Sequence, residues 1–201
     1  MAFEAVKTAL EKKGYAVRCF DTKEAAVDYL CAEIHDTTVG FGGSVTLQEL
    51  GLLERLKQNN ELISHWYPKE GQSREETLAE AMKTKVYLCS VNGLAETGEI
   101  VNIDGTGNRV ASTIFGHEKV YFVVGKNKLA PTEEAALWRA RNIASPKNAQ
   151  RLKRNTPCAV KADRCYNCSS PERICRAASI FWEAPKGAKY EVILVDEELG
   201  Y

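Results

Sequence analysis

Two polar stretches of the sequence have the composition of anion-binding loops. The first is FGGSVTLQE at 41–49, in which Gly42, Gly43 and Ser44 follow a short apolar run and precede a helical pattern. Main-chain amides at such a strand-to-helix turn lack partners within the helix and can hold an anion. The stretch has neither the dinucleotide fingerprint nor the lysine of a P-loop, and a plain tight turn with glycines at positive φ explains it equally well.

The second stretch, VNIDGTGNR at 101–109, mixes amides, an acid and a base with glycines between two apolar runs. Its candidate binding residues are Asn102, Asp104, Gly105, Asn108 and Arg109. A hairpin turn needs only an Asp-Gly or Gly-Asn pair, so the other polar side chains indicate a binding loop. Because Arg109 can hold a carboxylate or phosphate through two parallel hydrogen bonds, we assign it as the anion-holding, catalytic residue. Loops that follow strands of an α/β sheet gather at one edge, so we expect Ser44 and Arg109 to share a ligand.

Three further polar residues follow apolar runs and should reach the same edge. Asn92 and Glu96 lie in CSVNGLAETG after one run, and Lys128 lies in GKNKLAP after another. A partly buried carboxylate can be tuned towards neutral pH, which makes Glu96 the candidate general base or nucleophile. Lys128 can supply a second positive charge. The alternatives, a solvated loop acid for Glu96 and a surface lysine for Lys128, stay open.

Four cysteines follow a C-x6-C-x2-C-x6-C spacing: Cys158, Cys165, Cys168 and Cys175. Two thiolates in a C-x2-C turn can grip one metal, and the outer two can complete a four-sulfur site for zinc or an iron-sulfur cluster. The spacing matches neither a ferredoxin run nor a common zinc ribbon, so a redox-active dithiol or four packing residues also stay open. We interpret the cysteine-rich segment 156–176 as an appendage and not as a second domain.

Alternating helices and strands must position these residues. Apolar spacing predicts helices at 3–12, 21–34, 47–58, 74–83, 109–116, 132–144 and 146–154. Capping boxes mark three of the helix starts, at Asp21 with Glu24, Thr46 with Glu49, and Ser73 with Glu76. Strands are predicted at 15–20, 37–41, 86–91, 99–104, 119–125, 176–184 and 189–197, and the stretch 59–72 is a loop or a short edge element.

This order of elements predicts a single α/β domain over residues 1–201, with three layers and a mainly parallel central sheet. The last two strands are joined by the turn-like PKGA and suggest a C-terminal hairpin or two adjacent strands. The cysteine-rich segment lies between this pair and the helical part of the chain.

The overall charge excludes some classes of partner. Lys plus Arg and Asp plus Glu both number 27, so no global field draws the protein to nucleic acid or to an anionic membrane. No run approaches the roughly 18 to 20 apolar residues of a membrane span. The N-terminal MAFEAVKTALEKK lacks the features of a signal peptide, so we expect a cytoplasmic protein whose cysteines are thiols or ligands.

Seven stretches in this order resemble the lactate-utilisation (LUD) domain family over nearly the whole chain: VGFGGSVTLQELG, NIDGTGNRVA, VVGKNK, PKNAQRL, TPCA, CYNCSSPERIC and the terminal LGY. The resemblance implies a fold like that of the NagB, RpiA and CoA transferase group, with a site at the strand ends. It adds Thr46 and Glu49 to Gly42, Gly43 and Ser44 as candidate ligand-binding residues.

The family resemblance also implies a role in the oxidation of L-lactate to pyruvate, as a subunit or accessory factor beside iron-sulfur proteins. A non-catalytic scaffold for such partners and a metal or redox module on the four cysteines are the alternatives. The chain departs from the family pattern at 91–97, which reads VNGLAET, and at Ala162 and Asp163 before Cys165. The cofactor and the substrate are not fixed by the sequence, and neither is a homo-oligomeric state.

Overall fold

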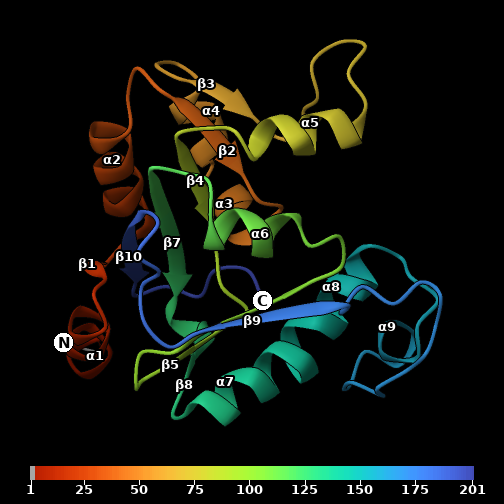
Figure 1. The fold of residues 1–201 in the computed structure, drawn as a ribbon. Helices are drawn as coiled ribbons and strands as arrows, with labels where there is room; N and C mark the ends of the chain where they lie inside the picture. Colours follow the sequence, from red (N-terminus) through yellow and green to blue (C-terminus); the bar gives the residue numbers. More distant parts are fainter. Residues whose placement is uncertain (1–2) are drawn as a thin grey trace.

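The structure is a computed structural model that describes residues 3–201. Its centre is a six-stranded sheet in the order β1-β10-β7-β4-β2-β3, and every neighbouring pair in it is parallel (Figure 1). The strands are β1 Ala16–Phe20, β2 Thr38–Phe41, β3 Glu61–Ile63, β4 Val86–Cys89, β7 Lys119–Gly125 and β10 Lys189–Val195. The prediction of an α/β domain with a mainly parallel central sheet is confirmed.

One face of the central sheet is covered by helices α2 Lys23–Glu33, α3 Val45–Glu49 and α4 Leu52–Leu56. Leu30, Leu47 and Leu52 pack there against strand residues such as Leu88 and Ile193, and all five are almost fully buried. Helices α2 and α3 begin close to the predicted positions, but the predicted helix 47–58 is divided into α3 and α4, with Gly51 at φ 61° directly before α4, and two of the predicted caps are wrong. Thr22 and Ser44 accept the capping hydrogen bonds, because only the residue directly before the first turn has its side chain beside the free amides.

The other face of the central sheet is covered by helix α1 Glu4–Lys12 and by a second sheet that the sequence did not predict. This sheet has the order β8-β5-β6-β9, with β5 Gly93–Ala95, β6 Ile100–Asp104, β8 Leu129–Ala130 and β9 Ala177–Phe181. Helix α7 Glu133–Arg139 packs on its outer side (Figure 1). The second sheet adds a layer to the three expected, and it was missed because β5 and β8 are too short to give an alternating pattern.

The predicted C-terminal hairpin is wrong. Strand β9 pairs with β6 in the second sheet, whereas β10 lies between β1 and β7 in the central sheet. The burial of the two strands explains the difference. Strand β10 is buried at every position after Lys189, as expected for a parallel strand that is covered on both faces, and β9 begins with exposed residues. The PKGA turn therefore carries the chain from one sheet to the other.

Two segments border the carboxyl end of the central sheet. Helix α7 continues without a break through a π-helical turn, Ala140–Ala144, into α8 Ser145–Arg151, and the cysteine-rich segment follows with the short helix α9 Pro157–Lys161. On the other side, the loop after β3 leads into α5 Arg74–Ala81, which has the predicted Ser73 and Glu76 capping box.

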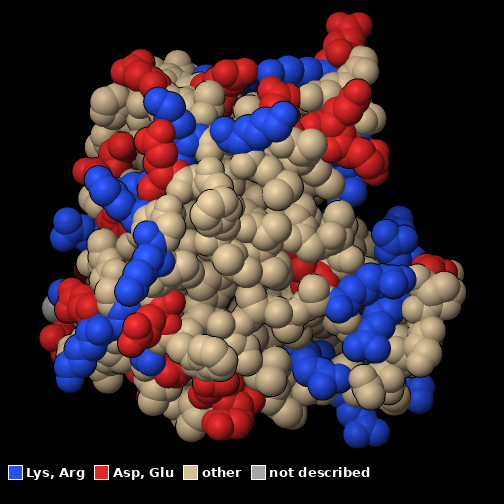
Figure 2. Space-filling view, viewed as in Figure 1, with Lys and Arg blue, Asp and Glu red and all other residues tan. Residues whose placement is uncertain are grey.

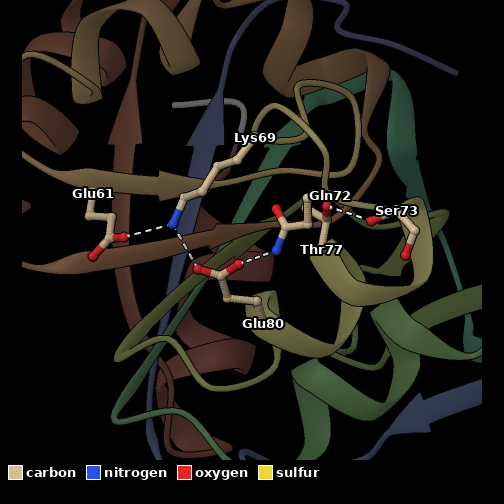
Figure 3. A network of polar contacts seen from close by, with 6 residues as sticks. All are labelled: Glu61, Lys69, Gln72, Ser73, Thr77 and Glu80. Carbon is tan, nitrogen blue, oxygen red and sulfur yellow. Dashed lines mark hydrogen bonds and ion pairs between the residues drawn. The ribbon is translucent and has the colours of Figure 1, made fainter.

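The loop before α5 is fixed by a polar network around Lys69 (Figure 3). The Lys69 ammonium group donates hydrogen bonds to Glu61 at 3.0 Å and to Glu80 at 2.9 Å, and Gln72 donates to the second oxygen of Glu80. These contacts join the start of β3 to α5 and hold the loop between them. None of the helices within residues 3–201 combines the length and the apolar character of a membrane span.

Candidate functional site: an arginine-lined cleft

A cleft of about 760 Å³ opens at the carboxyl ends of the parallel strands. Its walls come from the turn after β2, the loop between β6 and helix α6 Asn108–Ile114, helix α8 and the end of the cysteine-rich segment. Its lining includes six arginines: Arg74, Arg109, Arg151, Arg154, Arg173 and Arg176. Figure 2 shows Lys and Arg side chains gathered over α8 and α9, at the right of the view. The cleft is therefore basic although the whole chain has no net charge.

The two loops that the sequence singled out meet in this cleft. Gly43 and Asn108 both line it, and so do Asn92, Asp104 and Gly105. A smaller cavity of about 50 Å³ lies next to it, because Gly43, Asn92 and Arg109 border both spaces. Ser44, Thr46 and Lys128 line the smaller cavity. Ser44 and Arg109 thus both line the smaller cavity, which borders the cleft.

Arg109 occupies the boundary between the two spaces. Its guanidinium donates to Asn102 Oδ1 at 3.3 Å, to Asn92 Oδ1 at 3.1 Å and to the main-chain oxygen of Ile103 at 2.6 Å. All of these acceptors are neutral, and within residues 3–201 no carboxylate forms an ion pair with Arg109. Its guanidinium is oriented by neutral oxygens and forms no ion pair within residues 3–201.

Asp104 organises the loop that carries Arg109. One carboxylate oxygen accepts from the Gly105 amide at 2.7 Å, and the other accepts from the amides of Arg109 and Val110 at 2.8 and 3.2 Å. Gly107, in the left-handed region at φ 91°, lets the chain enter helix α6. Asp104 therefore satisfies the free amides at the start of α6, and both of its oxygens are used within the loop.

Two of the predicted glycines allow close approach of neighbouring chain segments. A Cβ atom on Gly42 would lie 2.8 Å from Cγ of Arg109, so only glycine lets the arginine side chain pass the turn. A Cβ atom on Gly105 would lie 2.7 Å from the main-chain oxygen of Ile174, at the end of the cysteine-rich segment. Both glycines have a packing role at the site.

Lys128 lines the smaller cavity and is not a surface lysine, because only 4% of the residue is exposed. Its Nζ atom lies 2.7 Å from Thr46 Oγ1 and 2.8 Å from Ser90 Oγ. Burial, followed by the charges of Arg139 and Arg109, lowers the pKa of Lys128 from 10.5 to about 7. Lys128 is therefore not the full second positive charge that we expected at neutral pH.

Four predicted residues line neither the cleft nor the smaller cavity: Gly42 and Asn102 contact Arg109, whereas Glu96 and Glu49 are exposed. Glu96 is exposed in the turn between β5 and β6, next to the first residues of β6, whereas Asp104 at the last residue of β6 lines the cleft. Because β5 pairs antiparallel with β6, which was not predicted, Glu96 lies at the end of this strand pair that is opposite to the cleft. Glu49 is also exposed, and its carboxylate accepts from the Gly200 amide at 2.7 Å, so it holds the chain near its last residue.

The structure does not bring the four cysteines together as a metal site. Within residues 3–201, no three His, Cys, Asp or Glu side chains are grouped closely enough to hold a metal ion, and all described cysteines are free thiols. Cys165 Sγ accepts from Arg141 and Cys175 Sγ accepts from Arg173, at 3.8 and 3.2 Å. A metal or iron-sulfur centre on these cysteines stays a prediction, and what the structure shows is that residues 171–174 and Arg176 of the cysteine-rich segment contribute a wall of the cleft.

Several lining residues were not predicted from the sequence. His65 and Trp66 come from the loop after β3, and Asn148 and Arg151 come from α8. His65 is half-buried beside Gly43, its Nδ1 atom has no partner within residues 3–201, and burial lowers its pKa. The PKNAQRL stretch predicted a helix and matched the family pattern, but neither placed Asn148 or Arg151 at the site. These side chains reach the cleft through tertiary packing, which residue spacing alone does not reveal.

The fold and the cleft together define a single-domain α/β protein with a basic site at the carboxyl ends of a parallel sheet. Residues 3–195 match the model of the LUD domain, and the chain belongs to the LUD domain family. It is similar to the uncharacterized protein YkgG of Escherichia coli K12, with 32% identity over 119 residues that cover 57% of this chain. That match covers 49% of YkgG, so the chain spans about half the length of the curated relative it matches.

A solved structure supports the fold assignment. The chain is similar to the crystal structure of a DUF162 family protein from Deinococcus radiodurans, with a TM-score of 0.53 and 12% sequence identity. The similarity covers 96% of both chains. At this level of identity the comparison concerns the fold alone.

Proposed function

We propose that this LUD domain protein binds a small 2-hydroxy or 2-oxo carboxylate in the cleft, with Arg109 holding the carboxylate group. The observation that carries the proposal is the guanidinium of Arg109, which neutral oxygens orient and no described carboxylate neutralises. A carboxylate ligand supplies the missing negative charge and accepts charge-assisted hydrogen bonds, which are about twice as strong as neutral ones.

The other charges of the cleft favour the same kind of ligand. Two carboxylates, Asp104 and Glu172, line it beside the six arginines. Asp104 accepts three main-chain amides, and Glu172 accepts two hydrogen bonds from Asn155. Both acids accept from protein amides, and within residues 3–201 neither forms an ion pair with an arginine of the cleft.

Membership of the LUD family supports a role in L-lactate utilisation. We propose that the protein is a subunit or accessory factor in the oxidation of L-lactate to pyruvate, and that iron-sulfur partner proteins accept the electrons. On this proposal the cleft holds lactate or pyruvate, which share a carboxylate and differ in the oxidation state of the neighbouring carbon.

Isothermal titration of the whole chain with L-lactate and pyruvate tests the proposal. We expect Arg109→Ala to weaken binding about tenfold to a hundredfold, because a charged hydrogen bond contributes about 1.5–3 kcal/mol. Arg55→Ala is the matched control, since Arg55 is exposed and pairs with Asp28 away from the cleft. The proposal fails if neither acid binds, or if Arg109→Ala binds them as tightly as the control does.

A further inference from the structure

The hydrogen bonds around Lys128 fix the direction in which each proton points. The Thr46 hydroxyl donates to the main-chain oxygen of Leu199 at 3.2 Å, and the Ser90 hydroxyl donates to that of Val123 at 2.6 Å. Because each hydroxyl has a single proton, both oxygens must accept from Lys128 Nζ. Two N–H groups of Lys128 are therefore used in these contacts.

A neutral amine satisfies both of these hydroxyl acceptors. It has two N–H groups, which Thr46 and Ser90 accept, and one lone pair, whereas an ammonium would carry a third N–H that meets no hydrogen-bond acceptor within residues 3–201. The nearby charges act in the same direction. Burial disfavours the ammonium most, Arg139 and Arg109 follow, and the opposite effects of Cys89 and Glu49 are smaller.

Lys128 also lies where a ligand of Arg109 can reach it. Both residues line the smaller cavity, and Arg109 borders the large cleft as well. Arg139 holds the main chain next to Lys128 and at Asn92, because it donates to the main-chain oxygens of Asn127 and Asn92 at 2.9 and 2.6 Å. It acts as a positioning residue for the lysine and for the loop of Asn92.

We propose that Lys128 is a nucleophile that forms an imine with the carbonyl carbon of a 2-oxo carboxylate whose carboxylate group is held by Arg109. The inference rests on the proposed function and names the chemistry of the same site. The lone pair of Nζ attacks the carbonyl carbon to form a C–N bond. The carbonyl oxygen then leaves as water with the two amine protons, so the step needs no oxidant or reductant.

Borohydride trapping of the whole chain with pyruvate tests the proposal at a pH above 7, where the amine is mostly neutral. We expect one adduct per chain, heavier than the protein by the mass of pyruvic acid less one oxygen atom, and peptide mapping should place it on Lys128. Lys128→Arg should abolish the adduct. Lys126→Arg is the matched control: Lys126 lies two residues away, is exposed and pairs with Asp196, so this variant should be labelled fully.

L-lactate supplies a second arm, because it has the carboxylate but no carbonyl group. It should protect Lys128 from labelling by pyruvate without forming an adduct itself. Absence of an adduct in the wild-type protein, or equal labelling of Lys128→Arg, overturns the inference. If pyruvate binds in the titration and no adduct forms, the inference fails while the proposed function stands. If an adduct forms at Lys128 in Arg109→Ala as readily as in the wild type, the role of Arg109 in both proposals fails.

Discussion

At the scale of single residues, the buried amine of Lys128 links the stability of the fold to pH. Its pKa is about 7 in the folded protein and returns to 10.5 when unfolding exposes it to water. Between these values the unfolded chain binds a proton that the folded chain does not. Stability therefore rises with pH across this window, by up to about 1.4 kcal/mol per pH unit from this one group.

Lys128→Met should remove this pH dependence. Methionine has a similar length and no charge to bury, and the Thr46 and Ser90 hydroxyls keep their own acceptors. We expect the variant to be more stable than the wild type near pH 7, with an advantage that shrinks as the pH approaches 10.5. Urea unfolding across this range measures the difference, and Lys126→Met serves as the exposed control. Parallel stability curves for Lys128→Met and the wild type would show that the amine is not desolvated.

At the scale of elements, the loop between β6 and α6 depends on one carboxylate. Asp104 accepts three amides with two oxygens, whereas an asparagine side chain has one oxygen and presents an NH₂ group to the remaining donors. Asp104→Asn should cost about 1–3 kcal/mol of stability, because an amide at the start of α6 loses its acceptor. It should also weaken carboxylate binding, since Arg109 is held by the same loop.

Hydrogen exchange together with chemical unfolding checks the prediction for Asp104→Asn. The amides of Gly105, Arg109 and Val110 should exchange faster in the variant, and exchange in β7 and β10 should change less. Asp28→Asn is the control, because Asp28 is exposed on α2 and only pairs with Arg55. Unchanged protection of the three amides would mean that Asp104 does not hold the loop.

The same elements show what the sequence could predict. Strands β4, β7 and β10 are nearly continuous apolar runs, so their residues alone indicate a buried parallel sheet. The loops after β2 and β6 could be predicted as candidate binding loops because polar side chains follow apolar runs there. Strands β5 and β8 have three and two residues, which give no period. His65 and Arg151 reach the cleft only because β3 and α8 pack beside it, and Glu96 was misplaced because the β5–β6 turn was not foreseen.

At the scale of the whole molecule, the charges are balanced in number but not in position. The chain has 27 basic and 27 acidic residues, yet the cleft is lined by six arginines and two carboxylates. The local field there attracts anions from a distance, and dissolved salt screens such a field over about 10 Å at 0.1 M and about 3 Å at 1 M. Ligand binding should therefore weaken with ionic strength.

Arg154→Glu isolates this field from direct contact. Arg154 lines the cleft, is exposed, and its side chain makes no hydrogen bond within residues 3–201, so reversing its charge should leave the fold intact. We expect carboxylate affinity to fall about twofold to fivefold near 0.1 M salt, as for an exposed charge, and the loss to vanish near 1 M. Titrations at the two salt concentrations measure the effect, with Arg55→Glu as the control on the far side of the central sheet. A loss that persists at high salt would assign Arg154 to direct ligand contact, and no loss at low salt would show that the field of the cleft does not steer the ligand.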